Sequence, residues 1–401
     1  MAGGPSASPL PERASPVRPS RLRRLMLAGL GSALGLPASG RAAAPAALSF
    51  PRDFGSHPEL RTEWWYITGY STSGPGEQGH DLGFQLTFFR VRLESTQTMA
   101  SRFAARHLLF AHAALTDLRS RRFWHDQRMA REGFAIAQAG QADTDLRLHD
   151  WTLKRLNGAY LAQVASRDFG LQLAFRPTQP VLLQGAGGVS RKGPGPTQSS
   201  WYYSQPQMAF DGAIRIADQR LAVRSGASAP HAGAASPGAP AVAANSSGAA
   251  WLDHEWSGQF LHPDAVGWDW IGINLFDGSA LTAFQIRDRA GRALWDGGSF
   301  RHPKLDAGSR PYVFARGEVI FQPQRFWKSP LTQAIYPVQW LVRTPSDQYL
   351  LKALLDNQEL DSRRSSGAVY WEGLSELFDS AGKSAGRGYL EMTGYAQPLV
   401  M

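Results

Sequence analysis

The chain has 401 residues, of which 43% are hydrophobic and 11% aromatic, enough to bury two or three domain-sized cores. It contains no cysteine, which excludes disulfides, thiolate metal sites and cysteine nucleophiles. The formal net charge of +9 is concentrated at the start, where residues 1–46 hold six arginines and one glutamate. About +4 remains for the other residues, with no basic stripe, so we expect no nucleic-acid partner.

Residues 1–46 have the pattern of an export signal. Arg23 and Arg24 precede a short apolar stretch, residues 25–36, and small residues follow it. The stretch has about 12 residues, which is shorter than a typical membrane-spanning helix. The arginine pair resembles a twin-arginine signal, and an ordinary secretory signal or an uncleaved anchor are the alternatives. We therefore expect a periplasmic or secreted protein.

Residues 47–224 show the alternation that is typical of β-strands. The stretch HDLGFQLTFFRVRL places large apolar residues at every second position from Leu82 to Phe88. Similar runs continue to residue 177, with turn signals such as Asn157-Gly158 between them. This pattern predicts the first of two all-β domains.

Residues 225–250 consist almost entirely of Ala, Gly, Ser and Pro and are predicted to be a disordered insertion. Residues 251–401 return to alternating strands and form the predicted second domain. Within it, residues 346–360 fit either a helix or a strand of an antiparallel meander. Two domains of this size fit antiparallel barrels or sandwiches of eight or more strands, with few short helices. The segments that begin at Trp64 and Trp268 echo one another, which suggests duplication.

The segment RTEWWYITGY, residues 61–70, carries two adjacent tryptophans. In an extended strand Trp64 and Trp65 point to opposite faces. Either both faces of this strand are covered, or one of them faces a cavity.

The segment WLDHEWSGQFLHPDAVGWDWIGINL, residues 251–275, has the densest mixture of acids and tryptophans. In a strand, Asp253 and Glu255 share one face, while His254 points the other way with Trp256. A carboxylate among tryptophans is poorly solvated, so its pKa should rise, which suits a general acid. The alternative is that these acids cap backbone groups or pair with arginines.

Acids adjoin large aromatic residues in three segments, as Glu63-Trp64, Glu255-Trp256 and Trp371-Glu372. Two interpretations stay open: apolar barrel interiors with a few placed acids, or acids paired with buried arginines such as Arg90 or Arg287. A further aromatic group, Trp201 to Tyr203, could line a cavity or seal a barrel mouth. Metalloprotease, serine-hydrolase and phosphate-binding motifs are absent, and the histidines match no metal-ligand spacing.

Six stretches resemble the AttH-like secreted proteins. In chain order they are HPELRTEWWYITGY, DLGFQLTFFR, WYYSQPQMAFDG, WLDHEWSGQFL, GWDWIGINLFDG and GRGYLEMTGY. That family is related to the carotenoid 1,2-hydratases and is often described as predicted secreted hydrolases. The resemblance covers about residues 50–400 outside the insertion. It implies two lipocalin-like barrels of the calycin type packed side by side, and a link to lipids or isoprenoids. In the DHEW stretch, Glu255 stands where the hydratases carry an Asn-like residue.

Three functions follow from this interpretation. The first is a carrier that binds a lipid or isoprenoid in an aromatic-lined barrel. The second is an enzyme, either a hydrolase or a hydratase that protonates an alkene and adds water to the cation. The third is a scaffold within an envelope complex.

For the hydratase, Asp253 or Asp269 would be the acid and His254 would position water. The predicted ligand-binding residues are Trp64, Trp65, Tyr66, Tyr202, Tyr203, Glu255, Trp256, Trp268, Trp270 and Trp371. We expect a monomer without cofactor or metal, and contact with a membrane surface or an envelope transporter.

Overall fold

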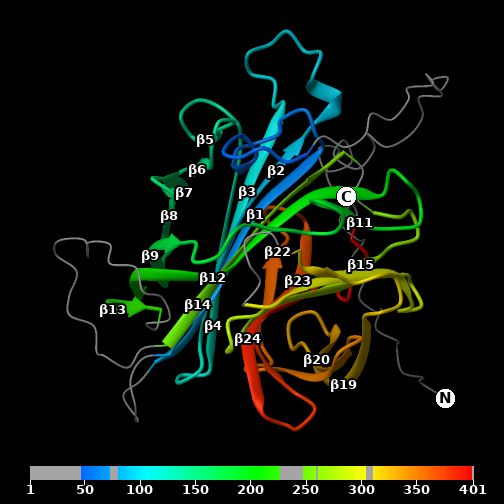
Figure 1. The fold of residues 1–401 in the computed structure, drawn as a ribbon. Coiled ribbons are helices and arrows are strands. Elements are labelled where there is room, and N and C mark those ends of the chain that lie inside the picture. Colours follow the sequence, from blue (N-terminus) through cyan, green and yellow to red (C-terminus); the bar gives the residue numbers. More distant parts are fainter. Residues whose placement is uncertain (1–46, 73–79, 226–246, 259–260, 304–309, 400–401) are drawn as a thin grey trace, which may run out of the picture. The chain divides into compact units, whose positions relative to one another are not determined.

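The computed structural model describes residues 47–72, 80–225, 247–258, 261–303 and 310–399 (Figure 1). The predicted export signal, residues 1–46, lies outside these ranges, as do residues 226–246 of the predicted insertion. The described residues form β-strands and two short 3-10 helices, Arg52–Phe54 and Glu94–Thr96, with no α-helix among them. A helix with the length and hydropathy of a membrane span is absent from these residues. The predicted all-β class is confirmed.

Fourteen strands of the described chain form the first antiparallel sheet. Its main path runs β4-β3-β2-β1-β14-β12-β9-β8-β7-β6-β5, and β10, β11 and β13 each pair with β12. The bounds are β1 Thr62–Thr72, β2 Asp81–Arg92, β3 His107–Asp117, β4 Arg122–Arg131, β5 Ala137–Ala139, β6 Asp145–Leu148, β7 Trp151–Leu156, β8 Ala159–Ala165, β9 Phe169–Arg176, β10 Leu182–Leu183, β11 Val189–Arg191, β12 Ser199–Ile216, β13 Gln219–Arg224 and β14 Ser247–Ser257.

The remaining ten described strands form the second antiparallel sheet, coloured yellow to red in Figure 1. Its path runs β18-β17-β16-β15-β24-β23-β21-β20-β19, and β22 pairs with β23. The bounds are β15 Gly267–Leu275, β16 Ala280–Arg287, β17 Ala293–Arg301, β18 Tyr312–Val313, β19 Ile320–Lys328, β20 Ile335–Arg343, β21 Gln348–Ala353, β22 Glu359–Ser362, β23 Ala368–Phe378 and β24 Ser384–Met392.

Strand β14 corrects the boundary that we placed at residue 251. It lies in the middle of the first sheet, paired with β1 over its full length and with β12 on its other side. Residues 247–250 belong to this strand and not to an insertion. A change in composition marks where a low-complexity segment lies, but it does not reveal which sheet the following strand joins. Of the two structures that fit residues 346–360, the strand is observed as β21.

Both sheets curl around apolar cores. Strand β12 pairs with β14 in its first part and with β9 in its second, across a register shift between Gln205 and Met208. Strand β6 also contacts β3 and β4, so the two ends of the first sheet approach one another and nearly close a barrel. The core inside the first sheet includes Trp65, Phe88 and Trp151, and the core of the second includes Tyr336 and Trp340.

A third apolar group lies between the two sheets. Tyr66, Tyr70 and Trp251 come from the first sheet, while Trp270 and Tyr389 come from the second. This group and the two cores mean that both faces of the central strands are covered. Of the two alternatives for the Trp64-Trp65 strand, both faces are therefore covered. Trp65 packs in the first core, and Trp64 packs against the group between the sheets.

The two sheets share a connection pattern. Strand β1 pairs with β2, its neighbour in the sequence, and with β14, which returns from far along the chain. Strand β15 likewise pairs with its neighbour β16 and with the returning strand β24. The echo between the segments at Trp64 and Trp268 therefore corresponds to equivalent strands of the two sheets.

Candidate functional site

Strand β14 distributes its polar side chains between two environments, because successive residues of a strand point to opposite faces. Asp253 and Glu255 lie on the face toward the second sheet, together with Trp251. His254 and Trp256 lie on the opposite face, inside the first sheet. Two separate polar clusters therefore meet at this one strand.

The first group, the interface acid cluster, consists of Asp253, Glu255 and Glu372, which are buried, and Glu391, which is half-buried. Asp253 accepts three hydrogen bonds from neutral donors. The Tyr202 hydroxyl donates to Oδ2 at 2.7 Å, the Ser204 hydroxyl to Oδ1 at 2.5 Å, and the Trp251 indole N–H to Oδ1 at 2.7 Å. Burial raises the pKa of Asp253 to about 7, although these hydrogen bonds oppose the shift.

Glu255 differs from Asp253 because it has a cationic partner. The ammonium of the buried Lys192 lies 3.0 Å from Oε1 of Glu255, and the Ser200 hydroxyl donates to the same oxygen at 2.5 Å. The Lys192 ammonium also lies 4.9 Å from the ring centroid of Tyr202 and 4.3 Å from that of Phe284. This ion pair brings one fixed positive charge into the acid cluster.

Glu372 and Glu391 are directly opposite one another on β23 and β24. Two adjacent buried carboxyl groups do not both ionise near neutral pH. Burial raises the pKa of Glu391 to about 7, and burial with the neighbouring Glu391 charge raises the pKa of Glu372 further. The Tyr66 hydroxyl is next to Glu372, and each group shifts the pKa of the other, but the two do not meet in good hydrogen-bond geometry and neither this hydroxyl nor Oε1 of Glu372 has another partner among the described residues.

Aromatic side chains surround these acids. The Trp270 indole N–H donates to the Tyr202 hydroxyl at 3.2 Å, and the Trp270 ring packs edge-on against both Tyr66 and Trp251. Tyr389 belongs to the same apolar group between the sheets. Asp253, Glu372 and Glu391 therefore lie in surroundings of low polarity, which favour their neutral forms.

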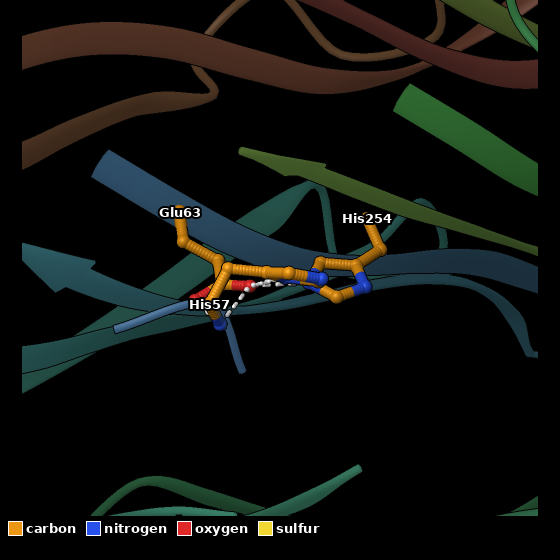
Figure 2. Close-up of side chains that lie close together, drawn as sticks. All are labelled: His57, Glu63 and His254. Atoms are coloured by element: carbon orange, nitrogen blue, oxygen red, sulfur yellow. Dashed lines mark hydrogen bonds and ion pairs between the residues drawn. The ribbon is translucent and has the colours of Figure 1, made fainter. Parts of the chain in front are cut away.

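The second group, the histidine cluster, consists of His57, Glu63 and His254 (Figure 2). Glu63 is on β1, His254 is on the neighbouring β14, and His57 precedes β1. Oε1 of Glu63 lies 2.7 Å from Nδ1 of His57 and 3.0 Å from Nε2 of His254. Arg90 donates to Oε2 of Glu63 at 2.8 Å from the opposite position on β2. The interpretation that an acid pairs with Arg90 is thus correct for Glu63.

The histidine cluster has a fixed charge arrangement. Burial alone would raise the pKa of Glu63, but hydrogen bonds from His254 and His57 and the Arg90 charge lower it well below its usual range. Burial lowers the pKa of His254 to about 4, although Glu63 opposes this shift. Near neutral pH, His254 is therefore neutral beside an ionised Glu63.

The donor atoms of His57, Glu63 and His254 lie within 4.8 Å of one another, a set that suits a divalent cation such as zinc. Nε2 of His57 also lies 3.1 Å from Asp53, as in many metal-binding histidines. However, the Arg90 guanidinium already neutralises Glu63, and it would repel a second cation. Hydrogen bonds and ion pairs already engage His57, Glu63 and His254, and the Trp256 and Trp65 rings stack on His57 and His254.

Asp269, the other predicted acid, lies elsewhere. Arg287 forms an ion pair with it at 2.7 Å, and Gln285 and Tyr395 donate to it at 2.8 and 2.9 Å. All these partners belong to the second sheet or its C-terminal extension, so the contacts of Asp269 do not connect it with Asp253. The interpretation that a buried acid pairs with Arg287 is therefore correct for Asp269.

The predicted ligand-binding residues fall into three groups. Those between the sheets are Trp64, Tyr66, Tyr202, Glu255, Trp268 and Trp270. Those around the histidine cluster are Trp65, Tyr203 and Trp256. Trp371 packs in the core of the second sheet, where its indole donates to the Asp356 carbonyl, so it belongs to neither cluster.

The sequence analysis did not select His57, Lys192 or Ser204. His57 lies six residues before Glu63, and that spacing is typical of no known site. Lys192 lies in the loop after β11 and reaches Glu255 only because β11 and β14 both pair with β12. Glu391 lies within the stretch GRGYLEMTGY, but its neighbour Glu372 is 19 positions away in the sequence and only strand pairing joins them.

The two curled antiparallel sheets, with polar clusters buried inside and between them, define a two-sheet protein of lipocalin-like fold. The chain belongs to the AttH-like family, whose model matches residues 41–395. The comparison with curated proteins found no match.

Two crystal structures share this fold. One is of a protein from Nitrosomonas europaea assigned to AttH. It is 42% identical, with a TM-score of 0.75, and the match covers 88% of this chain and 98% of that one. The other is kievitone hydratase from Nectria haematococca, with 13% identity, a TM-score of 0.63, and coverage of 88% and 94%. At 13% identity the second likeness shows the fold alone.

Proposed function

We propose that this protein binds an apolar alkene of the lipid or isoprenoid class between its two sheets and adds water to the double bond. The observation that carries the proposal is Asp253, a buried carboxyl group with neutral hydrogen-bond donors and a pKa of about 7. Such a group holds a proton near neutral pH and can transfer it, as a general acid requires.

The surroundings of Asp253 suit each step of the reaction. The acid transfers its proton to one alkene carbon and leaves a carbocation on the other. The three donors to Asp253 then stabilise its carboxylate, and the aromatic faces of Trp251 and Trp270 stabilise the cation. The oxygen of a water molecule bonds to the cation, and its released proton passes to the Glu372–Glu391 pair while one member of that pair is ionised. Return of a proton from the pair to Asp253 restores the acid. The net change is alkene plus water to alcohol.

Unpartnered polar atoms support binding of water or a hydroxyl group at this place. The Tyr66 hydroxyl and Oε1 of Glu372 are buried and lack hydrogen-bond partners among the described residues. A buried polar group without a partner costs about 1–3 kcal/mol, so a water molecule or an alcohol bound there would be stabilising. The fold shared with a hydratase is consistent with this chemistry.

Binding without catalysis is the second candidate. The aromatic composition of the group between the sheets favours it, because such residues bind apolar ligands without any acid. Native mass spectrometry of protein purified from its own host would reveal a retained lipid. A stoichiometric lipid that is never converted would favour the carrier over the hydratase.

The test of the proposed reaction uses ¹⁸O-labelled water and a panel comprising a prenylated aromatic, an acyclic isoprenoid and an unsaturated fatty acid. The proposal predicts an alcohol carrying one labelled oxygen, and its loss in Asp253→Asn with substrate binding retained. Glu359→Gln is the matched control, because Glu359 is also a buried carboxyl held by three hydroxyl groups, on β22 of the second sheet. Equal turnover in wild type and Asp253→Asn would remove Asp253 from the mechanism.

A further inference from the structure

Exposed apolar side chains gather where two loops of the first sheet meet. One loop, residues 93–106, joins β2 to β3, and the other, residues 132–136, joins β4 to β5. The loop patch consists of Met99, Phe103, Phe134 and Ile136, whose exposed fractions are 48%, 60%, 49% and 41%. Large apolar side chains are rarely grouped on a surface without an apolar partner.

The loop patch is an ordered arrangement of two loops. The rings of Phe103 and Phe134 stack with centroids 5.7 Å apart and planes 11° apart. The Arg131 guanidinium lies 4.1 Å from the Phe134 centroid and donates to the Phe103 carbonyl at 2.5 Å. Arg131 thus ties the loops together and holds both phenyl rings at the surface.

The backbone of the second loop is strained. Phe134 and Ala135 have φ angles of 58° and 57°, in the left-handed region that favours glycine. For residues with a side chain this conformation costs about 1–2 kcal/mol each. The protein therefore retains an energetically unfavourable turn that exposes a phenyl ring. Strained backbone of this kind is concentrated at binding and active sites.

The charge around the loop patch is positive. Residues 93–106 and 128–136 contain four arginines and two glutamates. Glu94 pairs with Arg92, and Glu132 lies 2.7 Å from His107. Arg128 pairs with Asp126, which leaves Arg102, Arg106 and Arg131 as the cations of the patch. Arg102 lies over the Phe103 ring at 5.2 Å, so a cation accompanies the most exposed ring.

We propose that the loop patch docks this protein onto a membrane surface that contains anionic lipids. Phenyl, methionine and isoleucine side chains fit the boundary between headgroups and acyl chains, and the adjoining arginines fit the lipid phosphates. Each arginine near an anionic surface contributes about 1 kcal/mol. This docking would not depend on the reaction proposed for the acid cluster.

The test is sedimentation of the full chain with phosphatidylcholine vesicles, with and without phosphatidylglycerol. The wild type should sediment with the anionic vesicles and be released by added salt. Phe103→Ser combined with Phe134→Ser should weaken this binding about tenfold or more. Phe326→Ser combined with Leu331→Ser is the matched control, because these residues are 56% and 58% exposed but lie outside the loop patch, and it should bind like the wild type.

Three results would overturn the proposal. The first is no sedimentation of the wild type with anionic vesicles, and the second is equal binding by both double variants. The third is equal binding of the wild type to vesicles without phosphatidylglycerol, because charge would then play no part. Arg102→Glu is a second test variant, to be used if the double variant Phe103→Ser with Phe134→Ser fails to fold. It keeps both rings, reverses one exposed charge and should weaken binding to the anionic vesicles alone.

Discussion

Asp253 and Glu63 are both fully buried carboxyl groups, but their neighbours give them opposite charge states. Asp253 has only neutral hydrogen-bond donors, so burial dominates and raises its pKa to about 7. Glu63 has Arg90 and two histidines beside it, and its pKa is lowered. The first is suited to donating a proton, and the second to holding the structure together.

The raised pKa of Asp253 has a consequence for stability. Because the unfolded chain releases this proton at lower pH than the folded chain, stability falls as the pH rises from about 4 to about 7. Asparagine can accept two of the three hydrogen bonds and donate to Tyr202, and it carries no charge. We therefore predict that Asp253→Asn gains stability relative to wild type over this range, by up to about 4 kcal/mol. Urea unfolding of both proteins at pH 4.5 and pH 8 measures the difference, and a difference independent of pH would contradict the prediction.

The lowered pKa of Glu63 predicts a structural role. Glu63→Gln keeps one oxygen that can accept from Arg90, but it removes the negative charge and leaves the buried guanidinium with neutral acceptors only, including the His57 and Leu60 carbonyls. Leaving one member of a buried ion pair unpaired costs about 3–5 kcal/mol, and chemical denaturation should show this loss. Glu94→Gln, which removes the exposed partner of Arg92, should change stability by less than about 0.5 kcal/mol. Equal small effects in both variants would show that the Glu63 pair is not required for stability.

At the scale of the strand, β14 shows what the sequence could and could not predict. Alternation correctly placed Asp253 and Glu255 on one face and His254 on the other, because side-chain direction in a strand is a local property. It could not show that β14 lies between β1 and β12, since the pairing joins residues nearly 200 positions apart. For the same reason Asp269, on β15, was grouped with Asp253 although its partner is Arg287.

The sequence of a single segment also could not predict which residues lie together in a site. Trp371-Glu372 has one member in the second core and the other in the acid cluster, because adjacent strand residues point opposite ways. His57 was missed because it lies in a loop, where no periodicity marks a residue for attention. Recognition of the family, in contrast, depended on several ordered motifs and is confirmed by the family model.

Contact between the sheets predicts that Gly83 on β2 tolerates no side chain. A Cβ atom there would meet the Tyr389 hydroxyl at 2.8 Å and Cβ of Leu374 at 3.0 Å, both from the second sheet. Gly83→Ala should therefore lower the free energy of unfolding by about 1–3 kcal/mol in urea titration. Gly258→Ala is the matched control, because its Cβ would meet only Leu60 at 3.7 Å. Equal stability of the two variants would contradict the contact.

At the scale of the whole molecule, the position of β14 predicts where the chain can be divided. A fragment of residues 47–224 lacks a central strand, which leaves β1 and β12 with unpaired edges. A fragment of residues 47–257 contains all fourteen strands of the first sheet. We predict that only the longer fragment unfolds cooperatively, as circular dichroism during heating would show. Cooperative unfolding of the shorter fragment would mean that β14 is not required by the first sheet.

The central claim is that Asp253, between the two sheets, keeps its proton to a much higher pH than an exposed aspartate does. The most direct measurement is a pH titration by carbon-13 NMR of protein labelled at the aspartate side-chain carboxyl, with Asp253→Asn identifying the resonance. The account predicts that the resonance missing from the variant titrates near pH 7. A resonance that titrates near pH 4, the range of an exposed aspartate, would contradict it.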